Sequence, residues 1–319
     1  MNLPAYADGC GGQAMDKAPT PCRPSWQGAK PVRRHRASPF IRFFDATPPG
    51  IICPHFHLLA HANGCPFRCD YCYLQLTLRR NRAPVLFSNL DGLTREVERF
   101  LSRDEPSVLN AGELADALAF DETAELMRLL VPMFGQQRKH KLLLLTKSTR
   151  VDPLLRLDHG EQTVVSFSLN SAEAAQSFEH GAPAPSARVE AARASHAAGY
   201  PVRLRIDPMV PLTGWRGSYL RLVDLLRRRT LPERVTLGTL RFFPSLPHFS
   251  RNGREVYSFA TSRDGLDGRL RLPLETRVEM YHTVIDHLPR LTVALCKETE
   301  EAWRLTSLDS RRCLCNCAL

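Results

Sequence analysis

Short apolar and β-branched runs alternate with amphipathic stretches from about residue 50 to residue 242. Six of these runs predict strands, at 57–61, 108–110, 141–146, 163–169, 202–208 and 235–242. Four stretches between them carry apolar residues at three-to-four spacing and predict helices, at 91–102, 121–134, 187–198 and 218–229. This alternation indicates βα units and a parallel sheet, and therefore an α/β fold. An open (β/α)6 barrel and a doubly wound sheet both accommodate that number of units.

The two ends of the chain differ from this middle part. Residues 1 to about 30 mix Gly, Pro, Ala and small polar residues without an apolar period, and they predict a disordered leader in which Cys10 and Cys22 are incidental. After residue 250 come a polar stretch, one helix at 274–288, a strand at 291–295 and a cysteine-rich tail. We therefore divide the chain into a largely disordered leader at 1–49, a barrel at 50–250 and a C-terminal extension at 251–319.

Charge and cysteine content narrow the class of protein. The formal net charge is +10, with arginine clusters at 33–36, 79–82 and 227–229. A polyanionic partner such as DNA and an arginine-rich background explain this charge equally well. No apolar run is long enough to span a membrane and no secretory signal begins the chain, so we expect a cytoplasmic protein without a membrane partner. In that compartment, clustered cysteines more often bind metal or do redox chemistry than form disulfides.

Three cysteines, Cys65, Cys69 and Cys72, follow the first predicted strand in a CxxxCxxC spacing. Three thiolates can hold three irons of a four-iron cluster and leave the fourth iron open to a substrate, much as catalytic zinc keeps one position open. The triad alone leaves a zinc site or a group of buried free cysteines as alternatives.

CxxxCxxC followed by an aromatic residue is the motif of the radical S-adenosylmethionine superfamily, which this segment resembles. The resemblance implies a [4Fe–4S] cluster on Cys65, Cys69 and Cys72, with S-adenosylmethionine chelating the open iron. It also implies a 5′-deoxyadenosyl radical and a reductant such as flavodoxin or ferredoxin, because the cofactor supplies the difficult chemistry. The fold implied is a partial (β/α)6 TIM-like barrel, with the site at the C-terminal ends of the strands.

From about Cys65 to Trp215 the sequence resembles one branch of that superfamily, the spore photoproduct lyases. The matching blocks fall in the family's order: 71–78, 146–147, 166–170, 178–181, 188–193, 198–200 and 208–215. The resemblance implies that Tyr73 takes part in returning a hydrogen atom to the product. It also makes Lys147, Ser168 and Asn170 candidates to contact S-adenosylmethionine or orient the substrate. Taken singly, these three are also explained as a solvated lysine and polar strand ends.

The chain departs from the lyases at the second predicted strand. There the family has a cysteine that returns a hydrogen atom, but residues 110–116 contain no cysteine. Gly112-Glu113 instead resembles the glycine–glutamate element with which other members of the superfamily bind the cofactor's amino group, a carboxylate against an ammonium. The alternative is a glutamate in the first turn of a helix. Without that cysteine, the product radical would be quenched by Tyr73, by another cysteine or by a group outside the chain.

A second departure is the tail, where four cysteines have the ligand count for an auxiliary iron–sulfur cluster or a structural zinc. They are Cys296, Cys313, Cys315 and Cys317. An unstructured thiol tail is the alternative, and Cys53 is a spare ligand or a small core residue.

On the fifth predicted strand Arg203, Arg205 and Asp207 are spaced by two, so they share one side, either the barrel interior or the helix layer.

These features lead to three hypotheses about function. The first is a radical enzyme of the photoproduct-lyase type that repairs a DNA lesion, favoured by the family-like blocks and the arginine clusters. The second is a radical enzyme that modifies a peptide or small metabolite, favoured by Glu113 and the cysteine tail. The third is a zinc- and nucleic-acid-binding protein without catalytic activity. Iron content separates the third from the others, and DNA binding with a steep salt dependence separates the first two.

Overall fold

A computed structural model describes residues 29–45, 47–81, 83–230, 232–250, 254–288 and 291–319. Its central sheet has eight strands in the order β16-β13-β12-β10-β9-β8-β4-β2. In chain order these are β2 (Ile41–Phe44), β4 (Phe56–Leu59), β8 (Val108–Asn110), β9 (Lys141–Thr146), β10 (Thr163–Leu169), β12 (Val202–Met209), β13 (Arg234–Thr239) and β16 (Thr292–Leu295). Every neighbouring pair from β4 to β16 is parallel, and β2 pairs antiparallel with β4 at the edge.

The order of the parallel strands decides between the two architectures that the sequence left open. The strands from β4 to β16 lie beside one another in the order in which they occur along the chain. A doubly wound sheet reverses its order at a switch point, whereas a barrel does not. The predicted partial (β/α)6 TIM-like barrel is therefore confirmed, with β16 as a seventh parallel strand.

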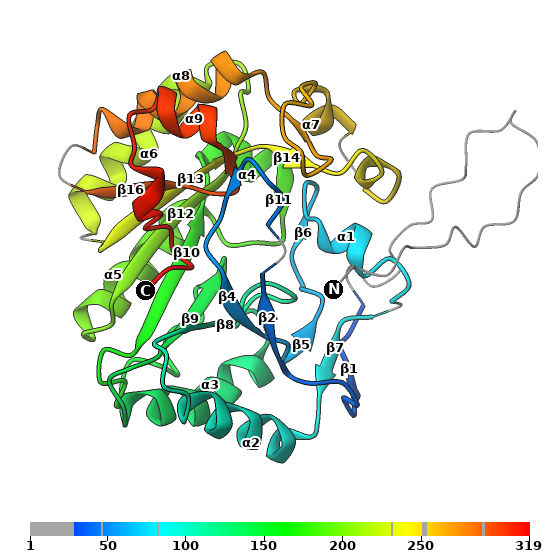
Figure 1. Cartoon of the computed structure of the whole chain (residues 1–319), viewed down its shortest axis with the longest axis vertical. Helices are drawn as coiled ribbons and strands as arrows, with labels where there is room; N and C mark the ends of the chain where they lie inside the picture. The colour runs from blue at the N-terminus through cyan, green and yellow to red at the C-terminus, as the bar shows by residue number, and fades with distance from the viewer. Residues whose placement is uncertain (1–28, 46, 82, 231, 251–253, 289–290) are drawn as a thin grey trace, which may run out of the picture.

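The main helices lie around this sheet (Figure 1). They are α2 (Leu90–Leu101), α3 (Asp121–Gly135), α4 (Ala172–Phe178), α5 (Pro185–Ala197), α6 (Trp215–Arg229), α8 (Leu274–Ile285) and α9 (Glu300–Leu305). Each buries an apolar stripe; in α2 it consists of Leu93, Val97 and Phe100. All seven residues of β10 are buried, as expected for a parallel strand covered on both faces. No helix of the described residues has the length and apolar character needed to cross a membrane.

Shorter elements connect and close this framework. The strands among them are β1 (Val32–Arg34), β3 (Ile51–Ile52), β5 (Ala62–Asn63), β6 (Arg68–Cys69), β7 (Val85–Phe87), β11 (Glu179–His180), β14 (Arg241–Phe242), β15 (Leu270–Arg271) and β17 (Glu298–Thr299). The helices among them are α1 (Leu74–Thr77) and α7 (Arg254–Ser258), with 3-10 turns at Leu246–His248 and Ser310–Arg312. Strand β17 pairs antiparallel with β3. This pair joins the chain just after β16 to the chain just before β4, which are the two ends of the row of parallel strands.

The predicted divisions at residues 49 and 250 need correction. Two strands lie inside the predicted leader, because β1 pairs with β7 and β2 pairs with β4. The C-terminal extension contributes β16 to the central sheet beside β13. The prediction failed at β1 and β2 because both strands are short and carry arginines, β1 is exposed and β2 is partly exposed, so neither shows an apolar period. Cys10 and Cys22 lie outside the described residues.

The C-terminal tail lies against the sheet instead of extending away from it (Figure 1, red). Asn316 is fully buried, and its side-chain amide donates to Ser166 Oγ at 2.7 Å and to the Leu204 carbonyl at 2.9 Å. Thr236 Oγ1 donates to Asn316 Oδ1 at 2.8 Å. These contacts come from β10, β12 and β13, so the tail is a packed part of the barrel. The alternative of an unstructured thiol tail is wrong.

Candidate functional site

The cysteine triad lies in a loop that the chain holds at several points. Cys69 is in β6 and pairs with Glu179 of β11, and the Cys72 amide donates to the Cys69 carbonyl at 3.1 Å. Gln75 is buried, and its amide donates to the carbonyls of Cys69 and Asp70 at 2.9 and 2.8 Å. The loop therefore has a defined conformation set by its own backbone and by β11.

The three thiols fit an iron–sulfur cluster. Cys65, Cys69 and Cys72 are free. Burial raises the pKa of Cys65, and the neighbouring charges of Asp116, Cys72 and Cys69 raise it further, so the three sulfurs lie near one another. Each iron of a four-iron cluster takes one cysteine, so three thiols supply ligands for three of its irons.

Lys147 and Ser168 meet beside the triad. Lys147 follows β9, Ser168 lies near the end of β10, and Lys147 Nζ donates to Ser168 Oγ at 2.9 Å. The Lys147 ammonium also lies 3.9 Å from the buried Glu179 carboxylate. Burial raises the pKa of Cys69, and the Lys147 charge lowers it, which places this cation near the triad. The two predicted residues are thus brought together at the C-terminal ends of neighbouring strands.

Glu179 is a site residue that the sequence interpretation did not assign. Its carboxylate forms an ion pair with Arg188 at 2.5 Å and accepts a hydrogen bond from the Tyr71 hydroxyl. Burial alone would raise the pKa of Glu179, but Lys147 and Arg188 hold it below its ordinary value. Glu179 is therefore a buried anion that fixes the Lys147 ammonium. The sequence could have identified it, because Glu179 and Arg188 both lie in the blocks that resemble the lyases.

Asn170 and Asp116 support the site through other residues. Asn170 is fully buried; its amide donates to the Pro208 carbonyl at 2.9 Å, and its Oδ1 accepts from the Tyr219 hydroxyl at 2.8 Å. Both ends of this side chain are thus engaged within the protein. Asp116, which was not predicted as a site residue, accepts the Lys147 amide at 2.7 Å and the Thr146 hydroxyl at 2.6 Å. It holds the backbone at the end of β9.

Glu113 and Tyr73 form a second polar group at the end of β8. The Tyr73 hydroxyl donates to the Glu113 carbonyl and lies 3.3 Å from its carboxylate, whose other oxygen accepts from Asn110 Nδ2 at 3.2 Å. A Cβ on Gly112 would lie 2.6 Å from the Leu145 carbonyl oxygen, so glycine is required where this loop meets β9. The alternative that Glu113 begins a helix is wrong, because α3 begins at Asp121.

The three polar residues of β12 point to the inner side of the sheet. Arg203 Nη1 donates to the Asn316 carbonyl at 2.9 Å, and Arg205 Nη2 lies 3.1 Å from Cys317 Sγ. Asp207 forms an ion pair with Arg241 at 2.9 Å. These contacts with the tail and with the segment after β13 place Arg203, Arg205 and Asp207 in the barrel interior. The spacing along the strand showed only that the three side chains share one side, not which side.

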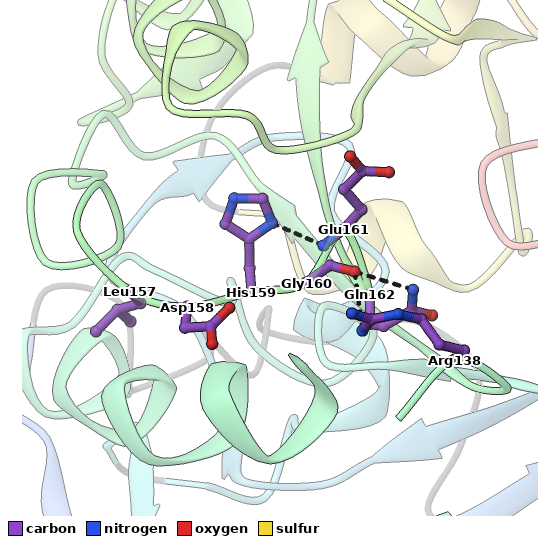
Figure 2. A pocket seen from close by; sticks show the side chains of 7 residues that line it. All are labelled: Arg138, Leu157, Asp158, His159, Gly160, Glu161 and Gln162. Carbon is purple, nitrogen blue, oxygen red and sulfur yellow. Dashed lines mark hydrogen bonds between the residues drawn. The ribbon is translucent and has the colours of Figure 1, made fainter. Parts of the chain in front are cut away.

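A separate hollow lies at the other end of β10. Figure 2 shows that Arg138 and residues 157–162 line it. Residues 157–162 directly precede β10. Ser168 is near the opposite end of β10, and at roughly 3.3 Å per residue the two ends are on the order of 20 Å apart. His159 Nδ1 accepts the Glu161 amide at 3.0 Å, and Arg138 Nη1 donates to the Gly135 carbonyl at 2.8 Å. These contacts serve the turn itself, and the hollow contains none of the predicted site residues.

Known proteins resemble this chain in sequence and in fold. The spore photoproduct lyase of Geobacillus sp. (strain Y412MC61) is 28% identical over 208 residues, which are 65% of this chain and 60% of that protein. The Bacillus subtilis (strain 168) spore photoproduct lyase is 28% identical over 181 residues, 56% of this chain and 53% of that protein. The chain thus spans somewhat more than half the length of these curated relatives.

A solved structure of a doubly substituted spore photoproduct lyase, with bound AdoMet and dinucleoside spore photoproduct, has a TM-score of 0.67 with this chain. The two are 24% identical, and the match covers 82% of this chain and 81% of that one. At this sequence identity the comparison shows a shared fold only. The profile of the spore photoproduct lyase family matches residues 55–256, which are more than half of the 319 residues and include the triad, Glu113, Lys147 and Ser168. This chain belongs to the spore photoproduct lyase family.

Proposed function

We propose that this protein is a radical S-adenosylmethionine enzyme that repairs a photoproduct lesion in DNA. One observation carries the proposal: three free thiols share the C-terminal ends of the barrel strands with Lys147, Ser168 and Glu113. Active sites of barrels occupy this end. Membership of the spore photoproduct lyase family supports the reaction class.

The residues of the site divide between two cofactors. Cys65, Cys69 and Cys72 would hold a [4Fe–4S] cluster, and Glu113 would accept hydrogen bonds from the ammonium group of S-adenosylmethionine. When bound, this pair supplies a 5′-deoxyadenosyl radical that abstracts a hydrogen atom from the substrate. Lys147 presents a fixed cation, because Glu179 and Ser168 hold its ammonium in place. A relative with bound AdoMet is consistent with this assignment.

Tyr73 is the proposed catalytic residue of the chain itself. Its side chain is 41% exposed, and its hydroxyl is held by Glu113 beside the last cysteine of the triad. We propose that this accessible phenol, next to the carboxylate proposed to bind S-adenosylmethionine, passes a hydrogen atom between product and cofactor. Asn170, whose side chain is engaged within the protein, would position the loops after β10 and β12.

DNA and a reductant such as flavodoxin or ferredoxin are the proposed partners. The net charge of +10 favours a polyanion, and exposed arginines lie at Arg33 and Arg34 of β1 and at residues 227–229 of α6. Lys and Arg that neutralise phosphates release counterions, so binding should weaken steeply with salt. A one-electron donor is needed because the radical is formed by reduction.

A second candidate function is modification of a peptide or small metabolite. One observation favours it: Glu113 occupies the segment in which the lyases have a hydrogen-donating cysteine, and residues 110–116 contain none. The third hypothesis, a zinc- and nucleic-acid-binding protein without catalysis, has less support. The match to the spore photoproduct lyase family favours an enzyme over this hypothesis.

The test is an anaerobic assay of the reconstituted, reduced protein with S-adenosylmethionine and a dinucleotide carrying the thymine spore photoproduct. We expect 5′-deoxyadenosine and restored thymidine by mass spectrometry, with both lost in Cys72→Ala. Tyr73→Phe should keep deoxyadenosine formation but restore less thymidine per deoxyadenosine. Deoxyadenosine without restored thymidine from the wild-type protein would remove the lesion as substrate and favour the peptide or metabolite reaction. Neither product, with no iron bound, would overturn the radical mechanism.

A further inference from the structure

Five free thiols outside the Cys65 triad come from three separate parts of the chain. Cys53 lies between β3 and β4, Cys296 follows β16, and Cys313, Cys315 and Cys317 lie in the tail. Strand β17 pairs with β3 so that Glu298 lies opposite Ile52, which brings the segments that carry Cys296 and Cys53 side by side. Arg241 Nη2 lies 3.1 Å from Cys296 Sγ, and Arg241 also pairs with Asp207 of β12. Arg205 of the same strand lies 3.1 Å from Cys317 Sγ in the tail. These contacts bring the three parts of the chain together, although up to 264 positions separate the cysteines.

We propose that Cys53, Cys296, Cys315 and Cys317 hold a second iron–sulfur cluster, separate from the Cys65 triad. Cys296, Cys315 and Cys317 are buried and Cys53 is half-buried. Cys313 is also half-buried, but it lies beside the turn at Ser310–Arg312, where the tail is exposed. The proposal adds Cys53 to the four tail cysteines that the sequence singled out and places Cys313 outside the ligand set. It does not depend on the lyase reaction.

The tail is anchored so that its two proposed ligands are fixed. Asn316 lies between Cys315 and Cys317, and its side chain bonds to Ser166, Leu204 and Thr236. Arg203 Nη1 donates to the carbonyls of Asn316 and Ala318 at 2.9 and 2.6 Å. A ligand held by its neighbours' hydrogen bonds needs little reorganisation to bind a cofactor.

Two buried guanidinium groups point at the sulfurs. Arg205 Nη2 lies 3.1 Å from Cys317 Sγ, and Arg241 Nη2 lies 3.1 Å from Cys296 Sγ. Arg241 is neutralised by Asp207, but Arg205 Nε has no hydrogen-bond partner among the described residues. A buried cation requires nearby negative charge, and a neutral thiol is a weak acceptor. A cluster held by four thiolates would supply both the charge and sulfur acceptors for Arg205.

The donor set suits a four-iron cluster. The thiols are free, and four cysteines can each hold one of its irons. Four cysteines leave no iron open, which suits one-electron transfer and not substrate binding. The place is next to the first site, because Cys317 contacts Asn110, which donates to Glu113.

The test uses a full-length variant in which Cys65, Cys69 and Cys72 are all replaced by Ala, reconstituted anaerobically with iron and sulfide. We expect about four irons per chain in this variant and about eight in the wild type, as two four-iron clusters require. The variant should also show an electron paramagnetic resonance signal after reduction. Because the first cluster is absent, failure of the lyase proposal would leave this result unchanged.

Single replacements assign the ligands in the same background. Cys53→Ser, Cys296→Ser, Cys315→Ser and Cys317→Ser should each lose the signal and most of the iron, whereas the matched control Cys313→Ser should keep both. Circular dichroism checks that each variant is folded. An iron-free triple variant, or a wild-type protein with about four irons per chain, would overturn the second cluster. Loss of the signal in Cys313→Ser but not in Cys53→Ser would overturn the ligand assignment.

Discussion

The Arg188 guanidinium lies 2.5 Å from the Glu179 carboxylate, and the two side chains are 0% and 1% exposed. Arg188 also donates to the carbonyls of Pro183 and Ser168, at 2.7 and 3.0 Å. It therefore ties helix α5 to β10 and to β11 at the point where Glu179 holds Lys147. The position of Lys147 in the candidate site therefore depends on a buried charge network of Arg188, Glu179 and Lys147, in which each charge is balanced by the others.

Removing Arg188 should be strongly destabilising. Arg188→Met keeps much of the volume but leaves Lys147, at 3.9 Å, as the cation paired with Glu179, and breaking a buried pair costs about 3–5 kcal/mol. We expect a loss of this size in the free energy of unfolding, measured with urea. The matched control is Arg193→Met on the same helix, whose exposed pair with Glu190 should matter little. Equal effects of the two variants would contradict a stabilising role for the buried pair.

Lys147 should contribute to S-adenosylmethionine binding. Replacing it by Met removes the fixed cation at the C-terminal end of β9 and should weaken binding by about tenfold or more, since a hydrogen bond to a charged group contributes about 1.5–3 kcal/mol. Equilibrium dialysis of the iron-loaded protein measures the affinity. Lys141→Met is the control, because Lys141 lies at the other end of the same strand and donates to the Glu161 carbonyl. Similar affinities in the two variants would remove Lys147 from the cofactor site.

Gly112→Ala should displace the loop that carries Glu113. The added methyl group would meet the Leu145 backbone, which cannot move without shifting β9. Overpacking of this kind costs about 1–3 kcal/mol, and S-adenosylmethionine affinity should fall with it. Gly217→Ala in helix α6 is the opposite case, because its methyl would meet only the flexible end of Arg221. That variant should be more stable by about 0.5–1 kcal/mol. A tolerated Gly112→Ala with normal cofactor binding would show that the loop is not constrained there.

Asp267 should make stability depend on pH. Burial would raise the pKa of Asp267, but the paired guanidinium of Arg271, at 2.7 and 2.8 Å, lowers it to about 2. The folded pKa lies below the ordinary value of 3.8, so the stabilisation is present above the unfolded pKa and is lost as the pH falls towards 2. The difference in unfolding free energy between wild type and Asp267→Asn should shrink by about 2 kcal/mol between about pH 6 and about pH 2.

The control for this pH dependence is Asp309→Asn, because Asp309 lies in an exposed pair with Arg311. Its effect on the unfolding free energy should be small at every pH. A difference for Asp267→Asn that stays constant over the whole range would mean that its carboxylate is not stabilised in the folded protein.

The local pattern of apolar residues in the sequence was enough to predict the strands that are buried on both faces. The predicted strands at 108–110, 141–146 and 163–169 coincide with β8, β9 and β10, because a strand covered on both faces is rich in apolar and β-branched residues. The spacing of the triad is also a local feature, whereas Lys147 and Ser168 became candidates only through the resemblance to the lyases. Barrel geometry then brings the ends of neighbouring strands together.

Only the tertiary structure decided the features that depend on chain closure. The edge strand β2 has no apolar period, so its pairing with β4 could not be predicted. The direction of Arg205 became clear only when the tail was found against β12, and Asn170 proved to be engaged within the protein. The neighbourhood of Cys53 and Cys317 joins residues far apart in the sequence. Periodicity reports the surroundings of one element, whereas such contacts depend on how the two ends of the chain pack into the same barrel.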